Sequence, residues 1–363
     1  MKKRIVFAAV LAVLFSLTSA YAQATEYFLY MTNAGTDVFA YMVDPSAGTL
    51  TAVNGSPFTA GRGPVGVAVD PAGKFVYVAN YASNNVSAYM IDPITGTLSA
   101  VDGSPFPVGS NPAGIAVEPA GKFIYVANNN DRNISAFTIN TGTGALTKVS
   151  GSPFPTGSGP TKIAIEPQGR FLYVTNNFGA SVSAFAINSS TGALSKVGGS
   201  PFAAGLYPGG IVLHPTGKSL YVANYNDGNV SAYAIDPNTG ALTALSGSPF
   251  PAGSSSWDIA VDPAGKFLYV TNNGKNNISA YTINPTSGAL IQVDGSPFPA
   301  GSNPQSVVVD PTGKLLYVTN NGSNSVSAYV IDPSTGELTA VDGSPFPVGR
   351  GPKGMAFATV SGP

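Results

Sequence analysis

The sequence contains no cysteine, and His214 is its only histidine. Disulfides, thiolate metal sites and cysteine nucleophiles are therefore excluded, so packing and strand pairing must hold the chain together. Because zinc sites draw on several His and Cys ligands, we expect none here. The sequence predicts neither a metal nor another cofactor.

Charged residues are also scarce, at only 10% of the chain. The single basic run is Lys2-Lys3-Arg4 at the start. Nucleic acid is not an expected partner, because phosphate binding needs clustered Lys and Arg. After the first segment, helical periodicity is absent, and no stretch is long and apolar enough to span a membrane.

The first segment, residues 1–24, is typical of a secretory signal. The basic run precedes an apolar stretch over residues 5–17, and small-x-small cleavage sites end at Ala22 and Ala24. We expect residues 1–24 to be a signal peptide, with an uncleaved anchor as the alternative. The mature protein is then exported, to the periplasm, the cell surface or the medium.

The remaining chain is dominated by repetition. A Tyr-Val-x-Asn motif recurs every 48 residues, beginning at Tyr77, Tyr125, Tyr173, Tyr221, Tyr269 and Tyr317, and a less exact copy begins at Tyr30. A Gly-Ser-Pro-Phe motif occurs seven times with the same spacing of 48 residues, beginning at Gly55, Gly103, Gly151, Gly199, Gly247, Gly295 and Gly343. A fixed period of this size indicates a repeat architecture.

Within one repeat the apolar residues alternate with a period of two, which predicts strands. In the second repeat these are residues 65–69, 74–80, 86–91 and 97–101, separated by Asp-Pro and Asn-rich turns. Four short antiparallel strands repeated seven times predict an all-β fold, a seven-bladed β-propeller. We assign residues 25–363 to this single domain.

The phase of the two ends predicts how the ring closes. The mature chain begins at a second strand, whereas residues 351–358 at the far end match residues 63–70, a first strand. We therefore expect the C-terminal segment to be the innermost strand of the first blade, which removes an open sheet edge. The phenylalanine of each Gly-Ser-Pro-Phe is expected to fill a gap between blades.

These motifs resemble the YVTN-repeat propellers, some of which occur in surface-layer proteins. These propellers are related to the propeller-fold lactonase family, which includes 6-phosphogluconolactonase and a muconate-cyclising enzyme. The resemblance covers essentially the whole mature chain. In the catalytic members, it implies a Gly-Pro-Arg-His motif at the start of an innermost strand and a glutamate after Tyr-x-x-Asn. Here no Arg-His pair and no glutamate occupies those positions in any repeat.

Positions that break the repeat are candidates for function, because the shared scaffold does not need them. They gather near the starts of the innermost strands (Arg62, Lys162, Tyr207, Trp257, Asp258, Gln305, Arg350 and Lys353), and the neighbouring loops add others (Asp131, Arg132, Phe178, Tyr225 and Asp227). We expect them to line one mouth of the central channel and to bind a small anionic or sugar-like ligand. Drift between duplicated repeats is the alternative.

His214 is expected to accept a hydrogen bond at the head of a turn, where other repeats carry Asp or Glu. Without a recognisable catalytic set, the first interpretation is a secreted, non-catalytic binding or surface-associated module. The second is a lactonase-like hydrolase with a non-standard site at the channel. The third is a platform for another exported protein.

Overall fold

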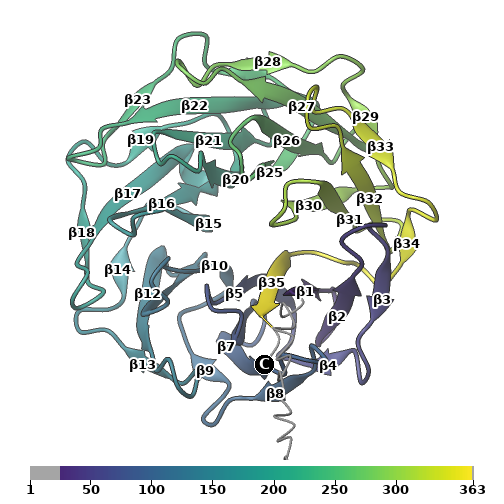
Figure 1. Ribbon diagram of the computed structural model, residues 1–363. Coiled ribbons are helices and arrows are strands. Elements are labelled where there is room, and N and C mark those ends of the chain that lie inside the picture. Colours follow the sequence, from purple (N-terminus) through teal and green to yellow (C-terminus); the bar gives the residue numbers. More distant parts are fainter. Residues whose placement is uncertain (1–24, 362–363) are drawn as a thin grey trace, which may run out of the picture.

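The computed structural model describes residues 25–361, which form seven β-sheets arranged in a ring around a central opening (Figure 1). Each sheet is a blade of four antiparallel strands, and a fifth strand of two residues pairs with the third strand. The predicted seven-bladed propeller is confirmed. The expected signal peptide, residues 1–24, lies outside the described residues.

Every blade has the same strand order from the channel outward. The inner strands are β35 (Met355–Ser361), β5 (Pro64–Val69), β10 (Pro112–Val117), β15 (Pro160–Ile165), β20 (Pro208–Leu213), β25 (Ser256–Val261) and β30 (Pro304–Val309). The second strands are β1 (Thr25–Thr32), β6 (Phe75–Asn80), β11 (Phe123–Asn128), β16 (Phe171–Asn176), β21 (Ser219–Asn224), β26 (Phe267–Asn272) and β31 (Leu315–Asn320).

The third strands are β2 (Asp37–Val43), β7 (Asn85–Ile91), β12 (Asn133–Ile139), β17 (Ser181–Ile187), β22 (Asn229–Ile235), β27 (Asn277–Ile283) and β32 (Ser325–Ile331). The outer strands are β3 (Leu50–Ala52), β8 (Leu98–Ala100), β13 (Leu146–Lys148), β18 (Leu194–Lys196), β23 (Leu242–Ala244), β28 (Leu290–Gln292) and β33 (Leu338–Ala340).

The two-residue strands are β4 (Phe58–Thr59), β9 (Phe106–Pro107), β14 (Phe154–Pro155), β19 (Phe202–Ala203), β24 (Phe250–Pro251), β29 (Phe298–Pro299) and β34 (Phe346–Pro347). A short 3-10 turn, η1 (Asn177–Gly179), follows β16. Within residues 25–361, no helix is long and apolar enough to cross a membrane.

We refer to the blades by their inner strands as A (β35), B (β5), C (β10), D (β15), E (β20), F (β25) and G (β30). In blade B, all four predicted strands agree with β5 to β8 to within a residue at each end. The sequence analysis missed the two-residue strands. In blade B this strand pairs with β7 through Asn85 with Pro107 and Val86 with Phe106, which is too short a run to show strand periodicity.

The C-terminal strand closes the ring as expected. β35 pairs antiparallel with β1, with Leu29 opposite Phe357 and Tyr27 opposite Thr359. The strand begins at Met355, later than the matching segment at residue 351, but the preceding Lys353 amide already donates to the Thr32 carbonyl at 2.8 Å. Blade A therefore joins the two ends of the chain (Figure 1).

The core lies between neighbouring blades. Seven buried clusters each combine strands of two adjacent blades, and the cluster of Leu29, Met31 and Tyr317 joins blade G to blade A. The repeated phenylalanines are half-buried against these clusters, as Phe106 is between blades B and C, so their predicted gap-filling role is confirmed.

Candidate functional site

The irregular positions of the sequence lie at the start of the inner strands, where strand pairing is interrupted. In blade D the register shifts between Pro160 and Ile163, and in blade F between Ser256 and Ile259. The two residues within each break are released from the regular alternation of the sheet. This local bulge is what turns Lys162 and Asp258 toward the channel rather than into a blade interface.

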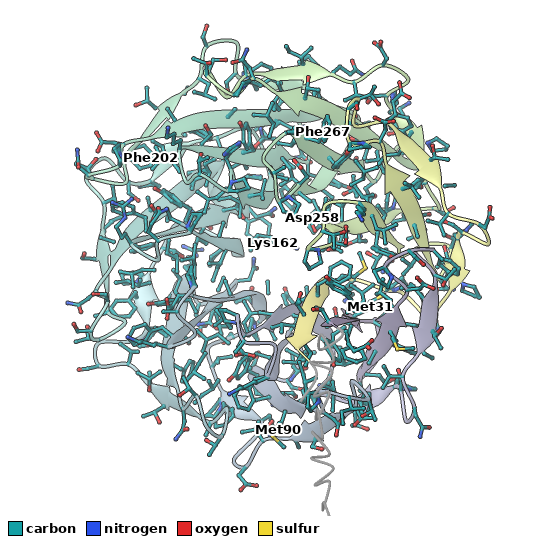
Figure 2. The ribbon with its side chains drawn as sticks, in the orientation of Figure 1. Met31, Met90, Lys162, Phe202, Asp258 and Phe267 are labelled. Carbon is teal, nitrogen blue, oxygen red and sulfur yellow. The ribbon has the colours of Figure 1, made fainter. Side chains whose placement is uncertain are left out.

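An ion pair connects these two blades past blade E, which lies between them. Lys162 Nζ lies 3.3 Å from Asp258 Oδ2, although the two residues are 96 positions apart in the chain. Both side chains are labelled beside the central opening in Figure 2. Ser306, from blade G, donates its hydroxyl to the same carboxylate oxygen at 2.9 Å. Three blades thus supply one polar cluster.

Glycine in blade E makes room for this cluster. A Cβ atom at Gly210 would lie 2.7 Å from Asp258 Oδ1, closer than such atoms approach in folded proteins. Gly209 and Gly210 therefore leave a stretch of backbone without side chains between Lys162 and Asp258. Asp258 therefore packs directly against the backbone of blade E.

Asp258 is held in place from several sides. It is only 6% exposed, and its own amide donates to Thr271 Oγ1 at 3.0 Å. Its Oδ2 atom accepts from both Lys162 and Ser306, so the buried charge is compensated. The Lys162 side chain is 33% exposed and remains accessible from the channel.

Blade A contributes a further cation at the start of its inner segment. Lys353 is half-buried, and this burial lowers the pKa of its ammonium group. The loss of solvation means that a neighbouring anion would be favoured at this position.

Aromatic side chains form a continuous row along the same part of the mouth. Ring centroids lie 5.6 Å apart between Phe178 and Tyr207, 5.9 Å between Tyr207 and Tyr225, and 5.6 Å between Tyr225 and Trp257. The row runs from blade D over blade E to blade F, as the ion pair does. Phe178 is 61% exposed, so the row presents ring surface to solvent.

Tyr207 occupies an unusual backbone conformation, with φ at 60°. The equivalent positions Gly63, Asn111, Gly159, Ser255, Asn303 and Gly351 also have positive φ. A bulky side chain in this region costs roughly 1–3 kcal/mol, and such strain gathers at functional sites. The Tyr207 side chain contacts Phe178 and Tyr225 within the aromatic row.

The predicted site residues are only partly brought together. Lys162 pairs with Asp258, while Tyr207 and Trp257 are joined through Tyr225. Arg62 and Arg350 lie exposed on the crossings before the inner strands, and Gln305 is half-buried. Within residues 25–361, no hydrogen bond or ion pair connects the side chains of Arg62, Gln305, Arg350 or Lys353 to the cluster.

Ser306 is the functional candidate that sequence reasoning missed. It follows Gln305 at the position held by Gly66, Gly114, Gly210 and Gly354 in four other blades. The departure from glycine was a signal, but serine is small and did not stand out. In the part of the chain that the structure describes, no group of three or more His, Asp or Glu residues could hold a metal ion.

His214 lies on the opposite face of the ring. Its Nδ1 accepts a hydrogen bond from the Thr216 amide at 3.2 Å, at the head of the turn between β20 and β21. The histidine thus accepts a hydrogen bond at this turn, as expected.

Comparison with known proteins identifies one matching family. The family described as "Lactonase, 7-bladed beta-propeller" matches this chain over residues 19–111, 104–158, 150–257 and 247–352. No curated protein matches the sequence.

Solved structures share the fold over nearly the whole chain. A provisionally assigned 6-phosphogluconolactonase from Bacteroides uniformis is 22% identical with a TM-score of 0.80, covering 92% of this chain and 99% of its own. A second such protein, from Bacteroides fragilis, is 22% identical with a TM-score of 0.80, covering 94% and 99%. The periplasmic gluconolactonase of Pseudomonas aeruginosa is 18% identical with a TM-score of 0.79, covering 93% and 100%.

These matches correct one expectation from the sequence. The first interpretation, a non-catalytic binding or surface-associated module, is wrong, because the matching family is one of lactonases. The Arg-His pair is absent from this chain, and Lys162, Asp258 and Ser306 form a different polar cluster at the channel. The lactonase-like alternative is better supported.

Proposed function

The chain belongs to the lactonase family of seven-bladed β-propellers, and from this premise we propose that it is a lactonase-like hydrolase acting at the mouth of its central channel. The observation that supports this site is the Lys162–Asp258 ion pair, in which an acid and a cation from two blades meet beside the glycine backbone of the blade between them. Both residues interrupt an otherwise regular repeat.

The proposed reaction opens the ring of a lactone with one water molecule. Asp258 takes a proton from the water as its oxygen bonds to the carbonyl carbon. The Lys162 ammonium, displaced from the carboxylate by the substrate, stabilises the negative charge that develops on the carbonyl oxygen. The bond to the ring oxygen then breaks, and that oxygen receives the proton, which leaves an open-chain hydroxy acid.

Ser306 acts in this proposal as a positioning residue. Its hydroxyl donates to Asp258 Oδ2 at 2.9 Å, so it would hold the carboxylate when Lys162 turns toward the substrate. Asp258 Oδ1, beside Gly210, is then the oxygen that receives the proton from water.

The aromatic row supports a sugar lactone as the substrate class. Sugar rings present C–H faces that pack on aromatic rings, and Phe178, Tyr207, Tyr225 and Trp257 offer such surface next to the ion pair. Half-buried Lys353 favours a substrate that carries a negative group. A phosphorylated or carboxylated sugar lactone satisfies both conditions.

A lactone panel tests the proposed function. The purified mature protein is given neutral, phosphorylated and carboxylated sugar lactones, and acid release is followed beyond the spontaneous rate. We expect turnover of at least one sugar lactone, accompanied by a change in the fluorescence of Trp257, the only tryptophan. Hydrolysis at the spontaneous rate for every lactone would refute the proposal.

We also propose that the protein is exported from the cytoplasm. The signal-like residues 1–24 support it, and one structural neighbour is described as periplasmic. Cell fractionation should place the mature protein outside the cytoplasm. Recovery of an unprocessed chain in the cytoplasm would contradict this assignment.

A further inference from the structure

A recess lies on the opposite face of the ring from the candidate site, between blades E and F. Its volume is about 1010 Å³, and its lining includes Ser219, His214, Lys218, Leu245 and Lys266. Two irregularities of the repeat meet here, Ser219 and His214. Neither has a role in the proposed hydrolysis.

Ser219 replaces a large apolar side chain. In five blades the equivalent residue is a phenylalanine whose ring faces the glycine of a turn in the next blade, as Phe75 faces Gly144, and in blade G it is a leucine (Phe28, Phe75, Phe123, Phe171, Phe267 and Leu315). Next to blade E, a Cβ atom at Gly288 of blade F would meet the Ser219 hydroxyl, Leu245 and the Tyr221 hydroxyl, but no phenylalanine ring. Space for a ring is therefore left between the blades.

The neighbouring side chains show the effect of this gap. Leu245 is only half-buried. Its counterparts in the other six blades are all buried, with exposures of 4–6% (Val53, Val101, Val149, Val197, Val293 and Val341). A ligand with an apolar ring would restore the contact that Leu245 lacks.

His214 replaces a carboxylate that binds backbone amides. In blade B, Asp70 Oδ1 accepts from the Lys74 and Phe75 amides, both at 2.6 Å. In blades C, D, F and G the acid likewise accepts from at least one of the two equivalent amides.

In blade E these two amides belong to Lys218 and Ser219, and His214 reaches neither. Its Nδ1 accepts from Thr216, and its Nε2 lies 3.0 Å from the Gly265 carbonyl in blade F. Within residues 25–361, no side chain accepts a hydrogen bond from the Lys218 or Ser219 amide. Ser219 is buried, and a buried backbone donor requires a partner, which an oxyanion in the recess would supply.

The charges around the recess also favour an anion. The replacement of an acid by His214 removes one carboxylate from this turn. Glu166, at the rim, is paired with Arg170. Within the described residues, Lys218 and Lys266 have no ion-pair partner.

We propose that this recess binds a small organic anion that carries both an oxyanion and an apolar ring. The oxyanion, a phosphate or a carboxylate, accepts from the Lys218 and Ser219 amides near the two lysines. The ring occupies the space that phenylalanine fills in five other blades. The site is separate from the channel mouth and independent of the proposed hydrolysis.

Calorimetric titration with phenyl phosphate and with phenylacetate tests the proposal, and the tighter of the two identifies the oxyanion. Two variants restore the repeat, His214→Asp and Ser219→Phe, and both residues already fit the same position in other blades. We expect each variant to keep the fold and any lactone turnover but to bind the tighter probe about tenfold more weakly or worse.

Lys162→Met is the control for binding at the channel mouth and should bind both probes as the wild type does. Benzyl alcohol, which lacks the charge, should bind at least about tenfold more weakly than the tighter probe. Absence of binding to the wild type, or binding by either restored variant as tight as that of the wild type, would overturn the proposal.

Discussion

The tyrosine of each Tyr-Val-x-Asn element connects one blade to the next. All seven are fully buried, and each donates its hydroxyl to a glycine carbonyl of the following blade at 2.8–3.0 Å; Tyr317 closes the ring through Gly48. A bond of this kind contributes roughly 1 kcal/mol, and losing it leaves a buried carbonyl without a partner. The Tyr-Val-x-Asn motif therefore indicates a structural contact between neighbouring blades and does not indicate a catalytic activity.

Buried tyrosines, both Tyr221 of this motif and Tyr41 and Tyr281 outside it, predict how stability changes in alkali. Burial raises the pKa of Tyr221 to about 12, and it does the same for Tyr41 and Tyr281. The unfolded chain releases these protons near the ordinary pKa of 10.0, while the folded chain retains them. The stabilisation of the folded state by these protonated, buried tyrosines is therefore fully present below pH 10, and it is lost as the pH rises from about 10 to about 12.

Urea unfolding at several alkaline pH values checks this prediction, with phenolate absorbance recorded on the folded protein. The urea midpoint should hold steady up to about pH 10 and then fall, while the buried tyrosines stay protonated. Ionisation of every tyrosine near pH 10 in an intact fold would be incompatible with the burial of Tyr221, Tyr41 and Tyr281.

At the level of elements, β35 determines whether the propeller is closed. It covers the edge of β1, and Met355 lies in the cluster that joins blade G to blade A. Without it, β1 would expose a row of unpaired backbone groups. Closure by a strand from the opposite end of the chain makes the stability of the ring depend on its last segment.

Removing residues 351–363 should lower the melting temperature by about 10 °C or more. A matched pair of substitutions refines this test. Ala358→Asp places a charge at a residue that is 1% exposed and should destabilise the protein, whereas Thr359→Asp on the exposed side should have little effect. An unchanged melting temperature after the deletion would refute the closing role of β35.

The strands could be read from the sequence because each repeat carries its own alternation and turn residues. Residues 65–69 became β5 (Pro64–Val69) because an Asp-Pro turn fixes its end. The two-residue strands could not be read in this way. Their pairing, such as Val86 with Phe106, depends on the crossing lying against the next-to-outer strand.

At the level of the whole molecule, the site arises from contacts across the ring. The repeat identified Lys162 and Asp258 as irregular, but their pairing depends on the two blades that flank blade E and on the glycine of blade E between them. Arg62 and Arg350 were equally irregular and yet lie on exposed crossings. Sequence periodicity places a residue within a blade, whereas the curvature of the ring decides which residues meet.

The measurement that tests this account most directly is the kcat/KM of Asp258→Asn with the best lactone of the panel. We predict a loss of about 100-fold or more, because the proton acceptor is removed. Asp294→Asn, an exposed change on the crossing that leaves blade F, serves as the matched control and should retain the wild-type value. A wild-type kcat/KM for Asp258→Asn would contradict the proposed site.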